Sequence, residues 1–281
     1  MHTFCPPVAV RRAGGSLLGV LALTLAIGCQ SSPGRPVDDA SWFADLLPQF
    51  ATAPSPSEAA RDAFNVYSPD RRREAVDYLA TAPFGGEPVY VRMYRLLIDD
   101  PDASVRASCA KALGLHGTAE DATAIIPLLR DDAAFVRWEA AKALQRLHNP
   151  DAAQPLATLL QDDEDADVRM EAATALGQYP SSAVFQTLVG ALHDTDYGVA
   201  RAARQSLRTL TGQDHGPEAG DWLAWADEQR SSEAMFAGRQ TYTYQPWSPP
   251  AGVLRRMQFW RDADPDAEPQ TPAGLEQPER G

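Results

Sequence analysis

The chain has 281 residues and a formal net charge of −13 at neutral pH. This acidic balance disfavours nucleic acids and anionic lipids as partners, because phosphate binding needs clustered cations. The sequence contains no glycine-rich phosphate loop, no nucleophile elbow, no His-Glu-x-x-His and no Cys-x-x-Cys. We therefore expect a protein that is not an enzyme, with no catalytic residues and no cofactor.

The N-terminal segment predicts export. Arg11 and Arg12 precede an apolar run, Leu17 to Ile27, that is too short to span a bilayer and suits the core of a signal peptide. The string Leu25-Ala26-Ile27-Gly28-Cys29 resembles the lipobox of bacterial lipoproteins, whose cysteine receives a diacylglycerol on its sulfur as the signal is removed. The resemblance implies a signal peptide over 1–28 and a lipid on Cys29. The alternatives are an ordinary signal peptide cleaved nearby and an uncleaved anchor.

The same resemblance predicts a location in the bacterial cell envelope, on the periplasmic face of a membrane, with the N-terminal lipid as the only membrane attachment. Gln30 favours the outer membrane, since an aspartate at this position would be the signal for retention in the inner membrane. Two stretches rich in Ser, Pro and Ala, 30–37 and 51–57, predict that 29–56 is a flexible tether.

A phrase recurs every 31 or 32 residues in the middle of the chain, as DPDASVRASCAKALG, DAAFVRWEAAKALQ, DADVRMEAATALG and DTDYGVARAARQSL. A period in this range is typical of a solenoid. Each unit reads as two helices, the first rich in alanine and ending near a leucine, the second rich in leucine. We therefore predict an all-α fold, a right-handed α-solenoid of four to five helix pairs over 57–212. The closing leucines of the first helices are Leu113, Leu144, Leu176 and Leu207.

The D-x-x-x-x-V-R-x-x-A-A-x-A-L phrase resembles the HEAT-like repeats named after the phycocyanobilin lyase subunits, over about half of the chain, from Tyr67 to Gly212. In that family the repeated Asp and Arg bond between neighbouring units as a structural ladder. One extra residue before Val168 makes Asp163 an equal candidate for the third aspartate. We also expect these aspartates to cap the helices that follow. The ladder residues implied by the resemblance are Asp100, Asp131, Asp162, Asp194, Arg106, Arg137 and Arg169.

The second helices are expected to line a concave surface that binds a partner. Pro127 falls inside one of them and should bend or shorten it, because proline lacks an amide hydrogen and its ring clashes with the preceding turn. The outward positions of these helices predict that the partner is contacted by Tyr90, Tyr94, Thr123, Thr158 and Gln186.

Helices and an extended segment are predicted at the two ends of the repeats. Residues 57–66 predict an N-terminal capping helix, and 213–230 predict a C-terminal capping helix. The residues expected to cover the open N-terminal end of the stack are Ala60, Ala63, Phe64 and Tyr67. Residues 231–260 predict an extended aromatic strap, and 261–281, rich in Pro, Glu, Asp, Ala and Gly, predict a disordered tail. The strap either lies along the solenoid or docks on another protein, through Tyr242, Tyr244 and Trp247.

Three weaker signals point to packing rather than chemistry. His116 and His148 lie in turns at the same edge of adjacent units, but zinc needs three or four ligands and no third is evident. The aspartate-rich turns lack the glycine-centred loop that holds calcium. Cys109 occupies a position where the other units have alanine, so we expect a buried thiol.

Together these patterns predict a non-enzymatic, lipid-anchored scaffold or adaptor that binds an envelope protein or peptide on the concave face of the solenoid. The alternative is a bilin lyase-like or other prosthetic-group-handling protein, which is implied only by the relatives that give the repeat its name. Export argues against this alternative, because those relatives act in the cytoplasm.

Overall fold

The computed structural model of the protein describes residues 54–244 and 270–275. The predicted signal peptide, Cys29, most of the tether, Trp247 and most of the predicted tail lie outside these residues. The described part contains twelve α-helices, three 3-10 helices and no strand. The α-helices are α2 (Pro56–Asp62), α3 (Pro69–Thr81), α4 (Pro88–Leu97), α5 (Ala103–His116), α6 (Ala122–Ile125), α7 (Ala134–Arg146), α8 (Ala153–Asp162), α9 (Ala166–Leu176), α10 (Ser182–Ala191), α11 (Tyr197–Thr211), α12 (Ala219–Asp227) and α13 (Ser232–Met235).

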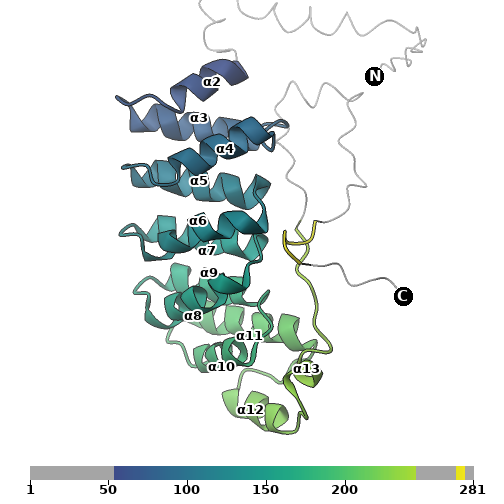
Figure 1. Cartoon of the computed structure of the whole chain (residues 1–281). Coiled ribbons are helices and arrows are strands. Elements are labelled where there is room, and N and C mark those ends of the chain that lie inside the picture. The colour runs from purple at the N-terminus through teal and green to yellow at the C-terminus, as the bar shows by residue number, and fades with distance from the viewer. Residues whose placement is uncertain (1–53, 245–269, 276–281) are drawn as a thin grey trace, which may run out of the picture. The chain divides into compact units, whose positions relative to one another are not determined.

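The helices stack in two layers in chain order (Figure 1). The first helices, α3, α5, α7, α9 and α11, each pack on the next. The second helices, α4, α6, α8 and α10, cover one side of that row. The predicted all-α solenoid of HEAT-like helix pairs is therefore confirmed. Among the helices of residues 54–244, none is both long enough and apolar enough to cross a bilayer.

The core repeats with the sequence. In α5, α7, α9 and α11 the valine before the ladder position is fully or almost fully buried, and so is the closing leucine about two turns later. Alanine pairs such as Ala140 and Ala141 let neighbouring first helices approach closely, since they have no side chain beyond Cβ. One close approach is at Gly114 of α5, where a Cβ would lie 2.9 Å from Cα and Cβ of Ala143 in α7.

Pro127 has the effect that its chemistry predicts. The α-helix α6 ends at Ile125, and the second helix continues as a 3-10 helix over Ile126–Arg130. The missing amide of Pro127 and its ring explain this change, because an α-helical turn there would need that amide. Leu128 and Leu129 are still buried, so the unit keeps its core despite the break.

Both ends of the stack carry a helix, as predicted, with different details. At the N-terminal end, α2 begins with a capping box between Ser55 and Glu58 and buries Ala59 and Ala63. The expectation that Phe64 and Tyr67 cover this end is wrong, since Tyr67 is 94% exposed and Phe64 is 51% exposed. The reason is that α2 stops at Asp62, and the chain then turns through Asn65 before α3 begins.

At the C-terminal end, α12 buries Trp222 completely against Phe185 and His215. The indole N–H of Trp222 donates to the carbonyl of Gly216 at 2.9 Å, so the buried polar edge of the ring has a partner. This helix therefore closes the apolar end of α10, as expected for the terminal cap of a solenoid.

The segment after α12 differs from the predicted extended strap at its start. Ser232–Met235 forms the short helix α13, capped by Ser231, and the chain becomes extended only near Gln240. The Ser231 side chain caps this helical turn, and the alternation of Tyr242 and Tyr244 begins later in the sequence.

The predicted tail over 261–281 is also corrected in part, since residues 270–275 lie against the repeats. The Gln270 and Tyr244 backbones exchange two hydrogen bonds of 2.8 Å, and Ala273 accepts from the His148 amide at 2.8 Å. Gly274 has a φ of 89°, and a Cβ there would lie 2.4 Å from the His148 carbonyl oxygen. Composition alone missed this contact because backbone hydrogen bonds and a glycine, rather than apolar mass, hold the segment.

Candidate partner-binding site

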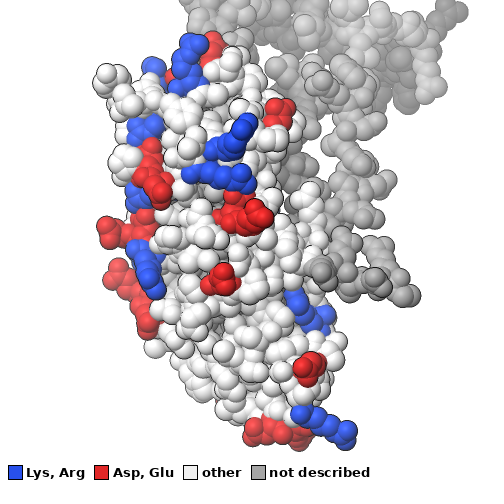
Figure 2. Space-filling view, viewed as in Figure 1, with Lys and Arg blue, Asp and Glu red and all other residues white. Residues whose placement is uncertain are grey.

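The predicted ladder is a row of two-pronged ion pairs at one edge of the stack. Each arginine donates through Nε and one Nη to both oxygens of an aspartate in the next unit, at 2.7 to 3.0 Å. The pairs are Arg72–Asp100, Arg106–Asp131, Arg137–Asp163 and Arg169–Asp194. Figure 2 shows acidic and basic side chains alternating along this edge. Such geometry is the strongest that guanidinium and carboxylate groups make.

Each ladder arginine also holds its own turn. The second Nη of Arg137 donates to the Asp131 carbonyl at 2.9 Å, and that of Arg169 donates to the Asp163 carbonyl at 2.9 Å. Burial raises the pKa of Asp163, but the bonds from Arg137 and from the Asp165 amide more than offset this, so its pKa lies below the ordinary value. For Asp194 the bond from Arg169 is the largest cause, and its pKa is lowered as well.

Asp162 is not a ladder residue. It is the exposed last residue of α8, and the carboxylate of Asp163 binds Arg137 instead. The physical reason is the extra residue in this unit, which lengthens α8 by one position and moves the turn forward. Arg72 also belongs to the ladder, because it pairs with Asp100 of the following unit in the same way.

The ladder aspartates do not cap the following helices. Instead each accepts a hydrogen bond from the amide two residues later, and in three units that later residue is a second aspartate that caps the helix. The caps are Asp102, Asp165 and Asp196. In the repeated Asp-x-Asp, the first carboxylate therefore binds the ladder arginine and the second caps the helix. The N-cap of α7 is Ala133, which provides no side-chain cap.

The predicted partner-binding residues of the second helices are not one surface. Tyr94 is fully buried, and its hydroxyl donates to the Gly85 carbonyl at 3.2 Å, so this prediction is wrong. Tyr90 packs its ring against Phe84. Thr123 and Gln186 are exposed on α6 and α10, and Thr158 is half-buried on α8. Tyr94 lies on the same face of α4 as the buried Val91 and Leu97, three residues to either side, and therefore points into the core.

The second-helix face over α8 and α10 is nearly free of charge (Figure 2). Leu160, Gln186, Thr187 and His193 are among the residues that line a shallow hollow of about 260 Å³ on it. Amide and hydroxyl groups from Gln161, Gln186 and Thr187 make up much of this surface, which, among the described residues that line it, carries no aromatic side chain other than the His193 imidazole.

Tyr242 and Tyr244 belong to the strap that the chain lays on its own repeats. The Gln240 amide donates to the Thr209 carbonyl at 2.8 Å, and the ring of Tyr244 lies 4.5 Å from the guanidinium carbon of Arg146. Burial raises the pKa of both tyrosines. Of the two readings of this segment, the intramolecular one therefore holds for residues 240–244. Trp247 lies outside the described residues.

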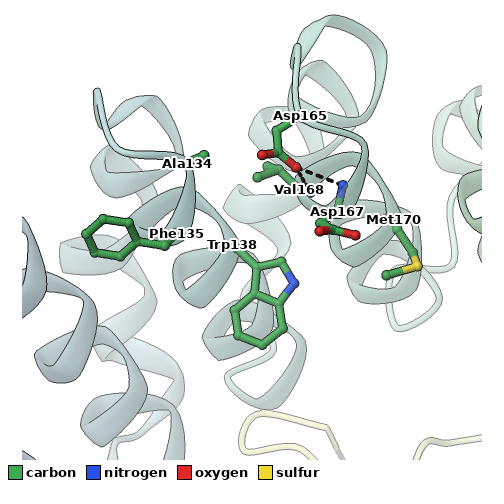
Figure 3. A pocket seen from close by; sticks show the side chains of 7 residues that line it. All are labelled: Ala134, Phe135, Trp138, Asp165, Asp167, Val168 and Met170. Carbon is green, nitrogen blue, oxygen red and sulfur yellow. Dashed lines mark hydrogen bonds between the residues drawn. The ribbon is translucent and has the colours of Figure 1, made fainter.

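A large hollow of about 590 Å³ lies between the N-terminal halves of α7 and α9 (Figure 3). Trp138 enters it from α7 and Met170 borders it from α9, whereas the ring of Phe135, which also lines the hollow, points to the other side of α7. Phe135 is 51% exposed, and Trp138 and Met170 are half-buried. Of its two acidic lining residues, Asp165 lies at the top in this view, and Asp167 lies lower, between Trp138 and Met170.

Phe135 and Trp138 also line a second hollow, of about 330 Å³, between α5 and α7. The two aromatic side chains therefore form a ridge with a hollow on either side. The ammonium of Lys142 lies 4.3 Å from the centre of the Trp138 ring and covers one face of it. We call Phe135 and Trp138 the aromatic ridge.

Sequence reasoning missed the aromatic ridge, although comparison of the units reveals it. At the position of Phe135 the other units have Ser104, Asp167 and Gly198, and at the position of Trp138 they have Ala107, Met170 and Arg201. Residues that pack one repeat on the next are expected to be similar in every unit. Aromatic residues that stand at these two positions in one unit, where the other compared units have different residues, are therefore not explained by the packing of the repeat.

The weaker candidates have structural roles. His116 lies 2.7 Å through Nε2 from the Ala80 carbonyl, and His148 stacks on Tyr179 with ring centres 4.8 Å apart. Cys109 is fully buried, which raises the pKa of its thiol. Within residues 54–244 and 270–275 no group of three His, Cys, Asp or Glu side chains is placed to hold a metal ion.

The chain matches the family model of HEAT repeats over residues 92–177 and 124–208. No curated protein matches it. Among solved structures it is similar to an engineered protein (19% identity, 67% of this chain and 99% of that chain, TM-score 0.48). It is also similar to YibA of Escherichia coli (22%, 62% and 68%, TM-score 0.46).

A third similar structure is the complex of CpcE and CpcF of phycocyanin lyase from Nostoc sp. PCC7120, with 20% identity over 81% of this chain and 94% of that chain and a TM-score of 0.41. None of the three TM-scores reaches 0.5, so no statement about activity follows from them. The HEAT-repeat match and the stacked helix pairs together establish the fold.

Proposed function

We propose that this protein is a non-enzymatic scaffold or adaptor, anchored by a lipid on Cys29 in the bacterial cell envelope, that binds a protein or peptide through its HEAT-repeat solenoid. The observation that carries the proposal is the aromatic ridge. Exposed aromatic side chains bordering hollows are typical anchors of protein interfaces, because they bury a large apolar area at a small cost in side-chain entropy.

The geometry also supports one binding surface over another. We assign binding to the first-helix face around α7 and α9 rather than to the second helices, since the hollow beside the aromatic ridge has both apolar and carboxylate lining residues. The hollow of about 590 Å³ lies within the range of about 300–1,000 Å³ that is common for ligand sites.

The test of binding is photocrosslinking in intact native cells, with p-benzoylphenylalanine in place of Phe135 and the chain kept on its own anchor. We expect one recurrent envelope protein to be captured, and we expect Trp138→Ala to abolish the capture. Tyr67→Ala is the matched control, because Tyr67 is an aromatic residue exposed far along the chain from the ridge. Equal capture by the chain with and without Trp138 would contradict the assignment.

The test of the anchor is labelling with a radioactive fatty acid followed by separation of inner and outer membranes. We expect label on the wild-type chain in the outer membrane and none on Cys29→Ser. Label that survives this substitution, or an unlabelled chain in the soluble fraction, would remove the anchor from the proposal without touching the binding surface.

The prosthetic-group alternative stays a prediction with its own readout. The chain would be mixed with free bilin, and the visible absorbance spectrum would be followed. We expect no change of the spectrum. A shift that Trp138→Ala abolishes would replace the proposed function.

A further inference from the structure

We infer that the partner segment bound at the aromatic ridge is basic, with one apolar side chain inserted between Trp138 and Met170 and lysine or arginine side chains beside it. This inference rests on the proposed function and specifies its partner. It follows from three properties of the hollow, namely its apolar floor, the charges at its rim and the ring faces that it presents.

The floor selects an apolar side chain. Ala134, Val168 and Met170 contribute aliphatic or thioether groups, and Trp138 contributes the face and edge of its indole. Met170 is unbranched and adapts to the shape of an inserted group. Insertion of a leucine-sized side chain would remove apolar area of both partners from water, at about 25 cal/mol per Å².

The rim selects positive charge. The turn from Asp162 to Arg169 carries five carboxylates and one arginine. Arg169 is bound to Asp194, Asp163 is bound to Arg137, and Asp165 accepts from the first amides of α9. The ladder therefore uses the cation of this turn and leaves most of its carboxylates over.

The carboxylates of this turn that do not take part in the ladder or in capping belong to exposed residues. Among the described residues, no hydrogen bond or ion pair engages the side-chain oxygens of Asp162, Glu164 or Asp167. Asp132, exposed in the turn before α7, likewise has no side-chain hydrogen bond or ion pair among the described residues. The partial positive charge of the helix N-termini, about half a unit each, does not offset this set.

The ring faces complete the argument. Lys142 already lies over one face of Trp138 in a cation–π contact. Its position near the middle of α7 places this cation at the end of the hollow away from the acidic turn. Phe135, half exposed on the other side of α7, offers a similar ring face to a second basic side chain of the partner.

The probe for the test is a fluorescein-labelled nonapeptide with leucine at its centre and two arginines and two lysines around it. The full chain, processed by its host and held in detergent, is titrated against this peptide by fluorescence polarisation. A matched peptide carries glutamate in place of each basic residue. We expect saturable binding of the basic peptide, no binding of the acidic one, and weaker binding as salt is raised, because exposed pairs are screened.

Two sets of variants separate charge from apolar contact. Asp167→Asn with Glu164→Gln should weaken binding about tenfold, as the loss of two exposed ion pairs implies. Asp227→Asn with Glu228→Gln on α12 is the matched charge control and should leave binding unchanged. Trp138→Ala should remove binding, and its thermal melt, followed by circular dichroism, shows that it is folded.

The inference is overturned if the basic peptide does not bind, if the acidic peptide binds equally, or if Asp167→Asn with Glu164→Gln leaves binding intact. Crosslinks from position 135 to residues 245–269 of the same chain, or to a second copy, would overturn it too. If position 135 captures an envelope protein through an acidic or neutral segment, this inference fails while the proposed function stands. If position 135 captures nothing in cells, the proposed function fails instead.

Discussion

The ladder arginine of each unit binds two groups at once, one in its own turn and one in the next unit. Arg137 holds the Asp131 carbonyl of its own turn and the Asp163 carboxylate of the next unit. Its side chain is 11% exposed and that of Asp163 is 4% exposed, so water screens the pair poorly. Such pairs specify how one unit sits on the next, because the guanidinium reaches both groups in one register only.

Asp163→Asn should therefore destabilise the protein, by about 3 kcal/mol, because it leaves a largely buried guanidinium without its carboxylate. Urea unfolding followed by circular dichroism measures the change in free energy of unfolding. Asp162→Asn is the matched control, one residue away and exposed, and should stay within about 0.5 kcal/mol of the wild type. Equal losses from the two variants would mean that the ladder is not formed as described.

The ladder also predicts how stability depends on acid. The pKa values of Asp131, Asp163 and Asp194 are lowered in the folded chain. Their contribution is thus complete above the unfolded value of about 3.9 and is lost as pH falls through the lower folded values. Burial raises the pKa of Glu139 and Glu171, so protonating these two side chains favours the folded state as pH falls from neutral.

We therefore expect the free energy of unfolding to hold or rise slightly from pH 7 to about pH 5 and to fall below about pH 4. A series of urea unfolding curves checks this. Glu139→Gln with Glu171→Gln should remove the rise and keep the fall, and Asp163→Asn should reduce the fall. A fall that is unchanged by Asp163→Asn would assign the acid sensitivity to other groups.

At the scale of helices, small residues decide how closely the first helices pack. Gly114 faces Ala143 across the α5–α7 contact, whereas Gly190 of α10 has nothing within 4 Å of the place of its Cβ. The same substitution at the two glycines should therefore have opposite signs.

Gly114→Ala should lower stability by about 1–3 kcal/mol, because overpacking exceeds the gain in helix propensity. Gly190→Ala should raise it by up to about 1 kcal/mol, since only the propensity changes. Thermal melting of both variants gives the comparison. An increase for Gly114→Ala would show that α7 shifts freely and that the contact is not tight.

At the scale of the whole described unit, the strap ties units together that are far apart in sequence. It runs against the chain direction of the repeats, from the Thr209 carbonyl at the end of α11 to Arg146 at the end of α7 (Figure 1). Residues 270–275 then bond at Arg146 and His148. Most contacts of a solenoid join neighbours, so a strap of this kind adds longer-range cooperativity.

Tyr244→Ala should loosen this strap without unfolding the repeats. We expect faster hydrogen exchange at the amides of Tyr244, Gln270 and Ala273, with the exchange of the α5 and α9 amides unchanged. Tyr197→Ala is the control, because Tyr197 is 80% exposed at the start of α11 and makes none of these contacts. Slow exchange at Gln270 in the Tyr244 variant would show that residues 270–275 dock independently.

The aromatic ridge belongs to the same scale, since it exists only as a relation between units. Phe135 and Trp138 read as ordinary helix residues within their own unit. Their meaning comes from Asp167 and Met170 of the next helix, which complete the hollow, and from the smaller residues at the same positions in the neighbouring units.

The repeat by itself determined the stacked helix pairs, the buried valine and leucine series, the buried Cys109 and the break at Pro127. These properties are local, and most of them are periodic, so the sequence of a single unit is enough to predict them. Register and long-range contacts were decided only by the tertiary structure. One inserted residue moved the ladder from Asp162 to Asp163, one position of helical phase put Tyr94 in the core, and residues 270–275 docked through backbone bonds. Such outcomes depend on which groups come into contact in the folded chain, and the spacing of residues along the sequence does not predict those contacts.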